Sequence, residues 1–186
     1  YQLRKSLANI SRYQNGVAVL FIDLDDFKKV NDSNGHNIGD QLLIQAAERV
    51  RLSIGDVDLV SRFGGDEFVI VLSHLKHLTQ AVAVAEKVLL QFKESIKLGS
   101  NIFYVSTSIG IAYTESATEK ADDLISHADI AMYEAKDNGG AQYHIYQQAM
   151  FHRVAKRVML ETEVRQALAK QQFSLSLQPQ ICAKTK

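Results

Sequence analysis

Two glycines followed by two carboxylates constrain this chain more than any other feature. Gly64-Gly65-Asp66-Glu67 lies between two short segments, 58–63 and 69–72, that are typical of buried strands. Paired glycines before a strand indicate a turn with positive φ, or a backbone that another group approaches closely. We therefore predict a β-hairpin with both carboxylates at its tip. Two like charges at the edge of an apolar sheet cost free energy unless a cation or a donor faces them. The tip is thus either a solvated turn or part of a cation site.

Another carboxylate follows the most apolar strand of the chain. Residues 17–22 show no polar alternation, which predicts a central strand covered on both faces, and this strand ends at Asp23. The end of such a strand is where ligands bind in many α/β proteins. If the hairpin tip lies beside it, Asp23, Asp66 and Glu67 converge. Clustered carboxylates favour a hard divalent cation such as Mg²⁺, which usually also binds substrate phosphates.

Hydrophobic periodicity predicts an α/β fold of the α+β sandwich type. Helical spacing of apolar residues predicts helices over residues 1–15, 40–54, 78–96 and 121–137. Strands are expected over 17–22, in the hairpin, over 102–113 and over 143–146. Residues 35–40 are expected to form a flexible polar loop before the second helix. The order β, α, ββ, α, β, α, β predicts a sheet of about five strands, mostly antiparallel and flanked by helices.

Composition excludes several classes of function. The net charge is zero and no basic stripe is present, so we expect no nucleic-acid partner. A single cysteine, Cys182, excludes an internal disulfide framework and favours a reducing compartment. There is no signal peptide and no apolar run of membrane-spanning length. The chain begins at Tyr1 without a methionine, so we expect a cytoplasmic domain from a longer protein, with membrane anchoring elsewhere in a bacterial sensor left open.

The character of the sequence changes after Tyr146. Residues 147–170 are expected to form a long exposed helix, and residues 173–180 alternate like a strand. We therefore predict three parts: a domain over 1–146, a linker helix over 147–170, and the start of a truncated second domain over 171–186.

The motifs of the first part resemble the diguanylate cyclase family, named for its Gly-Gly-Asp/Glu-Glu-Phe signature. The matching pieces are residues 23–32, 35–40, 62–68 and 128–136, and the resemblance runs from Val17 to Tyr146. It implies a fold similar to the nucleotidyl cyclase and polymerase palm. It also implies an enzyme, a nucleotidyltransferase that condenses two GTP into cyclic di-GMP and releases pyrophosphate. Attack of a 3′-hydroxyl on an α-phosphate would take place across a homodimer, because each subunit binds one GTP.

The resemblance also implies roles for particular residues. Asp23, Asp66 and the backbone carbonyl of Leu24 would hold Mg²⁺, with Mn²⁺ as an alternative. Asp66 or Glu67 would assist deprotonation of the hydroxyl, with Asp66 as the preferred base, and Lys28 would neutralise charge on the phosphoryl oxygens. Asn31 and Asp40 would read guanine, whose donors suit an amide oxygen and a carboxylate. The substrate-binding set is Phe27, Lys28, Asn31, His36, Asp40, Gly64, Gly65 and Lys136.

Two departures from the family pattern affect the expected activity. Gly55 stands where members with product inhibition carry an arginine, although Asp58 is kept, so we predict no feedback inhibition at this position. Gly140 and Ala141 stand where the family often has Arg-Asn, so one phosphate contact is missing.

The tail resembles the entry into a cyclic di-GMP phosphodiesterase domain of the Glu-Ala-Leu type. The similar pieces are 160–161, 164–168 and 177–180, and none of that domain's metal ligands falls within this chain. A phosphodiesterase domain in the same full-length chain is therefore expected. It leaves an alternative function open, in which the first domain binds GTP, makes little product and regulates the phosphodiesterase.

Overall fold

The central strand β1 (Gly16–Leu24) is buried along its whole length. It pairs antiparallel with β3 (Glu67–Leu75) on one side and with β6 (Thr107–Thr114) on the other. The edge strand β2 (Leu59–Gly64) pairs with β3, and β7 (Tyr143–Ile145) runs parallel to β6, so the sheet order is β2-β3-β1-β6-β7. The prediction of a five-stranded, mostly antiparallel sheet is confirmed.

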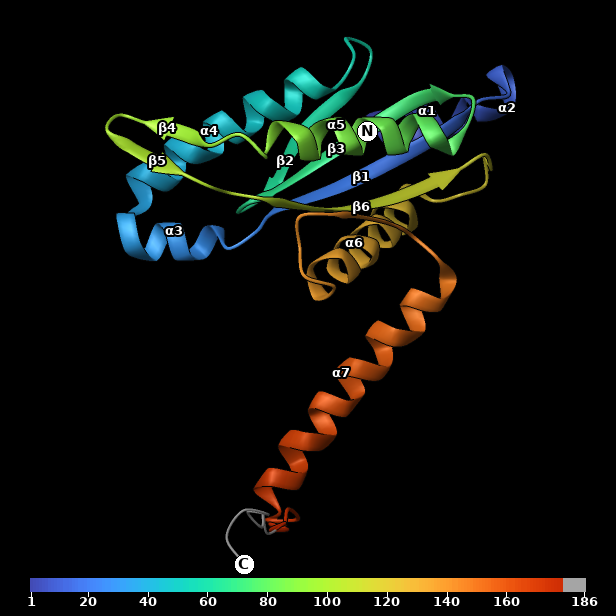
Figure 1. The fold of residues 1–186 in the computed structure, drawn as a ribbon. Coiled ribbons are helices and arrows are strands. Elements are labelled where there is room, and N and C mark those ends of the chain that lie inside the picture. Colours follow the sequence, from blue (N-terminus) through green and yellow to red (C-terminus); the bar gives the residue numbers. More distant parts are fainter. Residues whose placement is uncertain (179–186) are drawn as a thin grey trace, which may run out of the picture. The chain divides into compact units, whose positions relative to one another are not determined.

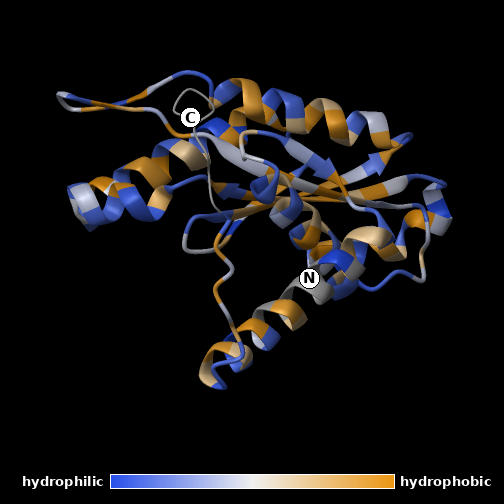
Figure 2. Ribbon diagram, turned by 60° about the horizontal axis from the view of Figure 1, so that its bottom comes forward, coloured by the Kyte–Doolittle hydropathy of each residue, from blue (hydrophilic) through white to orange (hydrophobic). Residues whose placement is uncertain are grey.

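Alternate side chains of β1 enter two separate cores, because successive residues of a strand point to opposite faces. Leu20 and Ile22 belong to the core on one face, together with helices α4 (His36–Ser53) and α5 (Leu78–Gln91). Val19 and Phe21 belong to the core on the other face, with α1 (Gln2–Ala8) and α6 (Ala121–Asp137). Figure 1 shows α4 and α5 on one side of the sheet and α6 on the other. These helices carry alternating hydrophobic and hydrophilic bands (Figure 2), as helices that cover a sheet on one side should.

The segment after β1 differs from its prediction. Residues 35–40 are not a flexible loop: α3 (Phe27–Asn34) follows β1 closely, and α4 begins at His36 rather than at Asp40. Gly35, with φ +82°, turns the chain between the two helices. Gly39 lies inside α4, where an added Cβ would come within 1.8 Å of the Asn31 side-chain oxygen. This glycine therefore permits close packing of α4 on α3, a tertiary role that its sequence context does not distinguish from a loop signal.

Three further boundaries were predicted wrongly. The helix expected over 78–96 ends at Gln91, and a small hairpin follows, formed by β4 (Ile96–Leu98) and β5 (Asn101–Phe103). The strand expected over 102–113 is interrupted before β6. The N-terminal helix is divided into α1 and α2 (Ile10–Tyr13). The guanidinium of Arg49 in α4 donates hydrogen bonds to the carbonyls of Gln91, Glu94 and Ser95, which gives the end of α5 polar partners that local periodicity cannot reveal.

This computed structural model describes residues 1–178. The chain divides into two compact units, Tyr1–Phe151 and a second that begins at His152. The predicted long helix is present as α7 (Gln148–Ala169). Residues 173–178 are irregular, so the strand expected over 173–180 is wrong for that part, and the remainder, with Cys182, lies outside the described residues. Within the described part, no helix is both long enough and apolar enough to cross a membrane.

We predict that the contact between β6 and α6 depends on Gly110. A Cβ at this position would lie 1.9 Å from the Ala128 carbonyl oxygen and 2.2 Å from the Met132 nitrogen. Both are helix backbone atoms and cannot rotate away, so Gly110→Ala should lower the free energy of unfolding by about 3 kcal/mol, the upper end for overpacked cores. Urea denaturation measures this. Gly64→Ala is the matched control, because its Cβ would meet no atom within 4 Å. Equal losses in both variants would contradict this role of Gly110.

Candidate active site

The register of β1 and β3 brings the predicted carboxylates together where β1 ends and β3 begins. We call this place, with Asp23, Leu24, Asp66 and Glu67, the sheet edge. Asp23 lies directly opposite Glu67 in the ladder. The backbone N–H of Leu24 donates to the carbonyl of Asp66 over 3.3 Å, which ties the hairpin tip to the end of β1. The predicted convergence of Asp23, Asp66 and Glu67 is therefore present in the fold.

The glycines of the hairpin are not required by packing within the protein. An added Cβ at Gly64 or Gly65 would meet no atom within 4 Å, although Gly65 has φ +50° and so favours glycine for its backbone. The hairpin tip is therefore open on its outer side. This openness leaves room for a ligand close to the backbone.

Asp23 is a buried carboxylate whose partner is a lysine. Its side chain is 7% exposed, and Lys136 Nζ lies 2.6 Å from its Oδ1. The angles of this ion pair fall outside those of a hydrogen bond, so the buried Oδ1 has charge compensation but no directed donor. A buried anionic oxygen needs a cation or a donor beside it, and in this structure the Lys136 ammonium takes that place.

Electrostatics make this sheet edge a centre that attracts cations. Burial raises the pKa of Asp23 to about 6; Lys136 opposes this rise, and the charges of Asp66 and Glu67 reinforce it. The pKa of Glu67 is also raised, first by burial and then by the neighbouring carboxylates of Asp129 and Asp66. Neighbouring carboxylates therefore make ionisation of Asp23 and Glu67 less favourable, and a divalent cation would relieve this repulsion.

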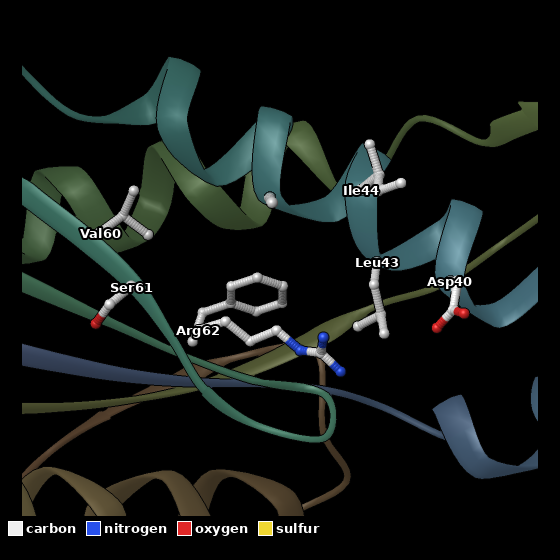
Figure 3. A pocket seen from close by; sticks show the side chains of 8 residues that line it. Asp40, Leu43, Ile44, Val60, Ser61 and Arg62 are labelled. Carbon is white, nitrogen blue, oxygen red and sulfur yellow. The ribbon is translucent and has the colours of Figure 1, made fainter.

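A cavity of about 490 Å³ lies between α4 and the hairpin. Figure 3 shows Asp40 and Leu43 on the α4 side and Arg62 extending from β2 toward them. Phe68 also lines the cavity, together with Ile44, Ala47, Val60 and Ser61. The Nε–H of Arg62 donates to the carbonyl of Gly65 over 2.8 Å, so one side chain joins this cavity to the hairpin tip. Most of the lining side chains are apolar, and the Asp40 carboxylate lies on one side, which suits a planar base with hydrogen-bond donors.

Asn31 on α3 has the same kind of unsatisfied atom as Asp23. Its Oδ1 is buried and accepts no hydrogen bond from the described residues. Gly39 makes room for this oxygen, since a Cβ there would collide with it. A buried acceptor without a donor costs about 1–3 kcal/mol, so its retention favours a donor supplied by a ligand.

A second cavity of about 370 Å³ lies beside the end of α6 and includes Lys136, Gly139 and Gly140 in its lining. Its architecture depends on Asp25, which was not among the predicted site residues. The Asp25 carboxylate accepts hydrogen bonds from the hydroxyls of Ser106 and Ser108 at 2.6 and 2.7 Å, and from the N–H of Ala141 at 3.0 Å. Asp25 therefore fastens the loop after α6 to the ends of β1 and β6.

The same loop shows what the departure from Arg-Asn means structurally. Gly140 and Ala141 both have positive φ, +71° and +54°. Asparagine tolerates this conformation better than alanine, so Ala141 is mildly strained there. A Cβ on Gly140 would lie 3.1 Å from Asp25 Oδ2. The backbone is therefore held tightly at the position that has lost its cationic side chain.

The predicted site residues form two groups and some outliers. Asp23, Leu24, Asp66, Glu67 and Lys136 gather at the sheet edge, and Asp40 faces the larger cavity. Phe27 is buried in the core, whereas Lys28 and His36 are exposed. Asn31, Lys28 and His36 are not among the residues that line either cavity.

Sequence reasoning gave no role to Arg62, Asp25 or Asp129. All three stand within the matched motifs, which was the available signal. The two serine hydroxyls that bind Asp25 lie at the start of β6, more than 80 residues away in the sequence, and no local pattern indicates this contact.

The carboxylates alone are not a complete metal shell. Within residues 1–178, no group of three or more His, Cys, Asp or Glu side chains is arranged to hold a metal ion. The oxygen donors that are present, the carboxylates of Asp23 and Asp66 with the Leu24 carbonyl, fit a hard cation that takes its other ligands from substrate or water. The buried Oδ1 of Asp23 already faces one cation, the ammonium of Lys136 at 2.6 Å, and this supports the fit.

We predict that Asp23→Asn stabilises the protein above pH 7. The folded pKa of about 6 exceeds the ordinary 3.8, so the folded state binds more protons between pH 4 and 6, and wild-type stability falls as pH rises through that window. Above it, the buried charge costs roughly 3 kcal/mol, which the neutral amide avoids.

Thermal unfolding at pH 4.5 and pH 8 measures this effect. Asp23→Asn should gain little at pH 4.5 and several degrees at pH 8, while the exposed control Asp32→Asn should not change with pH in this way. A variant less stable than wild type at pH 8 would contradict the assigned cost of the Asp23 charge.

Comparisons with known proteins identify the family of this chain. The sequence profile of the family described as "Diguanylate cyclase, GGDEF domain" matches residues 1–142. The bifunctional diguanylate cyclase/cyclic di-GMP phosphodiesterase MucR of Pseudomonas aeruginosa is 36% identical over 182 residues, covering 98% of this chain and 26% of MucR. The cyclic di-GMP phosphodiesterase NbdA of the same organism is 35% identical over 173 residues, covering 93% of this chain and 22% of NbdA.

A solved structure supports the same assignment. The crystal structure of the GGDEF domain of TpbB (YfiN) from Pseudomonas aeruginosa superimposes with a TM-score of 0.74 at 32% identity, covering 78% of this chain and 91% of that one. The chain spans about a quarter of the length of the two curated relatives. By profile, sequence and fold, the chain belongs to the diguanylate cyclase family and contains its GGDEF domain.

Proposed function

We propose that this domain binds GTP with Mg²⁺ and that two copies condense two GTP into cyclic di-GMP, with release of pyrophosphate. The observation that carries the proposal is the β1–β3 register, which sets Asp23 opposite Glu67 and joins Leu24 to Asp66. A carboxylate-rich sheet edge thereby lies beside a cavity with the shape and polarity for a base. A member of this family is in general dependent on a divalent metal, and the choice of Mg²⁺ follows from the oxygen donors.

The larger cavity is the proposed guanine site. Asp40 would accept hydrogen bonds from the N1 and N2 donors of guanine, and the Oδ1 of Asn31 would gain the donor that it lacks in the protein. Leu43 and Phe68 supply apolar walls. Adenine lacks this donor pattern, so the set favours GTP over ATP.

The sheet edge and the smaller cavity are the proposed triphosphate site. Asp23, Asp66 and the Leu24 carbonyl would hold the cation, which would supply Lewis-acid stabilisation of charge on the phosphoryl oxygens. Lys136 lines the cavity beside them, and Lys28 stands on the first turn of α3, from where a long side chain can reach an anion. Asp66 would receive the proton of the attacking 3′-hydroxyl, with Glu67 next to it. One domain holds one nucleotide, so the reaction would need a second copy with its site facing the first.

A second function has its own support. The loop after α6 carries Gly140 where the family often has arginine, and Lys136 pairs with Asp23. The relative NbdA is named as a phosphodiesterase alone, and the match to MucR extends past residue 142 into the tail. These observations favour a domain that binds GTP, turns it over slowly and regulates a phosphodiesterase domain beginning near residue 171.

Synthesis of cyclic di-GMP decides between the two. We predict that the chain with GTP and Mg²⁺, at concentrations that allow dimers, forms cyclic di-GMP, and that Asp66→Asn lowers kcat about 100-fold or more while GTP affinity changes only a few-fold. Chromatography of the products and calorimetric titration of GTP measure the two quantities. Asp32→Asn, on the exposed face of α3, is the control and should keep the wild-type rate. Tight GTP binding without product would favour the regulatory function instead.

Product inhibition should be absent. The N–H of Gly55 donates to Asp58 Oδ2 over 3.1 Å, so this carboxylate closes a local turn and has no arginine at position 55 to share a bound dinucleotide with. We predict that added cyclic di-GMP leaves the initial rate unchanged. Gly55→Arg is the matched gain-of-function variant, since position 55 has no positive φ and its Cβ would meet only the Asp58 carboxylate. Inhibition of the wild-type domain by micromolar cyclic di-GMP would refute the prediction.

A further inference from the structure

The ammonium group of Lys136 occupies the place beside Asp23 that the proposed function gives to a divalent cation. Its Nζ lies 2.6 Å from Asp23 Oδ1, and the lysine side chain is 36% exposed, against 7% for the aspartate. The lysine thus reaches from solvent into the buried end of β1. No directed hydrogen bond holds it there, because Oδ1 has no partner with hydrogen-bond geometry among the described residues. An ion pair of this kind is held by charge and can exchange.

The same side chain lines the second cavity. Lys136 shares that cavity with Asp25, Gly139 and Gly140, whereas Asp23 is not among the residues that line it. A lysine ammonium is a compact charge on four flexible carbons, so rotation of the side chain alone can move it between neighbouring anions. It therefore stands within reach of two sites, but one ammonium group cannot neutralise both.

The backbone that carries Lys136 is fixed. Gly139 N–H donates to the Lys136 carbonyl, and Gly140 N–H donates to the Ala135 carbonyl, both over 3.1 Å. The side-chain amide of Gln142 also donates to Ala135, and Asp25 holds the N–H of Ala141. The end of α6 is thus anchored from several directions. Any movement of the charge must come from the side chain and not from the helix.

We propose that Lys136 is the resident cation of Asp23 in the nucleotide-free domain and that it keeps divalent metal off Asp23 until a triphosphate draws the ammonium into the second cavity. The inference rests on the proposed function, because the competing ligand is the metal-bound nucleotide. It gives Lys136 a second role, as a positioning residue of the cation site. Free metal then binds weakly, and metal and triphosphate each raise the affinity of the other, because a coupling free energy between two sites is reciprocal.

The test is the affinity of Mn²⁺ for the nucleotide-free chain at pH 8.0, measured by electron paramagnetic resonance of the free ion. Lys136→Met should bind Mn²⁺ at least about tenfold more tightly than wild type, equivalent to about 1.4 kcal/mol. Lys28→Met is the matched control: Lys28 is also a proposed phosphate ligand, but it is exposed and lies outside the Asp23 ion pair. Its Mn²⁺ affinity should stay within about twofold of wild type. An unchanged or weaker affinity in Lys136→Met would overturn the proposal.

Two further variants keep the test decisive if Lys136→Met does not fold. Lys136→Gln should show the same gain in Mn²⁺ affinity, and Lys136→Arg, which keeps the charge, should show none. In the folded wild type, the Nζ resonance of Lys136, assigned by its loss in Lys136→Arg, should shift when Asp23 is changed to Asn. A resonance insensitive to that change would overturn the ion pair directly.

These measurements need no turnover. The proposed function and the role of Lys136 can therefore be refuted independently of each other. A chain that makes no cyclic di-GMP but gains Mn²⁺ affinity in Lys136→Met would refute only the proposed function. A chain that makes cyclic di-GMP while Lys136→Met leaves Mn²⁺ affinity unchanged would refute only the role of Lys136.

Discussion

The pairing of Asp23 with Glu67 across β1 and β3 is the constraint on which the site depends. Antiparallel register moves in whole residues, and a slip of one would turn every core side chain of β1 to the other face. The two cores, one with Leu20 and Ile22 and the other with Val19 and Phe21, therefore fix the register by packing alone. The free energy of hydrophobic burial is what holds mutually repelling carboxylates at one edge, where they would not gather by themselves.

That edge carries an electrostatic cost that the protein meets in two ways. Lys136 compensates the charge of Asp23 directly. Asp25, two residues further along the chain, accepts hydrogen bonds from two hydroxyls and a backbone N–H. The difference between these two aspartates is informative. Asp25 has its acceptors filled by neutral donors and acts as an anchor, whereas Asp23 keeps a buried oxygen without a directed donor and so remains able to accept a cation.

Much of the fold and the main outline of the site could be predicted from the sequence, because both rest on local patterns. The unbroken apolar run before Asp23 and the paired glycines before Asp66 identified the central strand and the hairpin that meet at the site. What failed was tertiary: Gly39 was taken for a loop signal although it makes room for Asn31, and the end of α5 depends on Arg49 from another helix. The pairing of Lys136 with Asp23 joins residues 113 positions apart through a helix end, and no spacing rule encodes it.

We propose that one sheet edge and the two cavities beside it form a single cation and nucleotide site. A crystal structure of the chain with Mn²⁺ and a non-hydrolysable GTP analogue, with the ion located by its anomalous scattering, tests it most directly. We expect the ion within coordination distance, about 2.2 Å, of an Asp23 oxygen. We also expect guanine between α4 and the hairpin, and the Lys136 side chain turned from Asp23 toward the phosphates. Manganese bound away from Asp23, or guanine outside the cavity lined by Asp40 and Phe68, would contradict it.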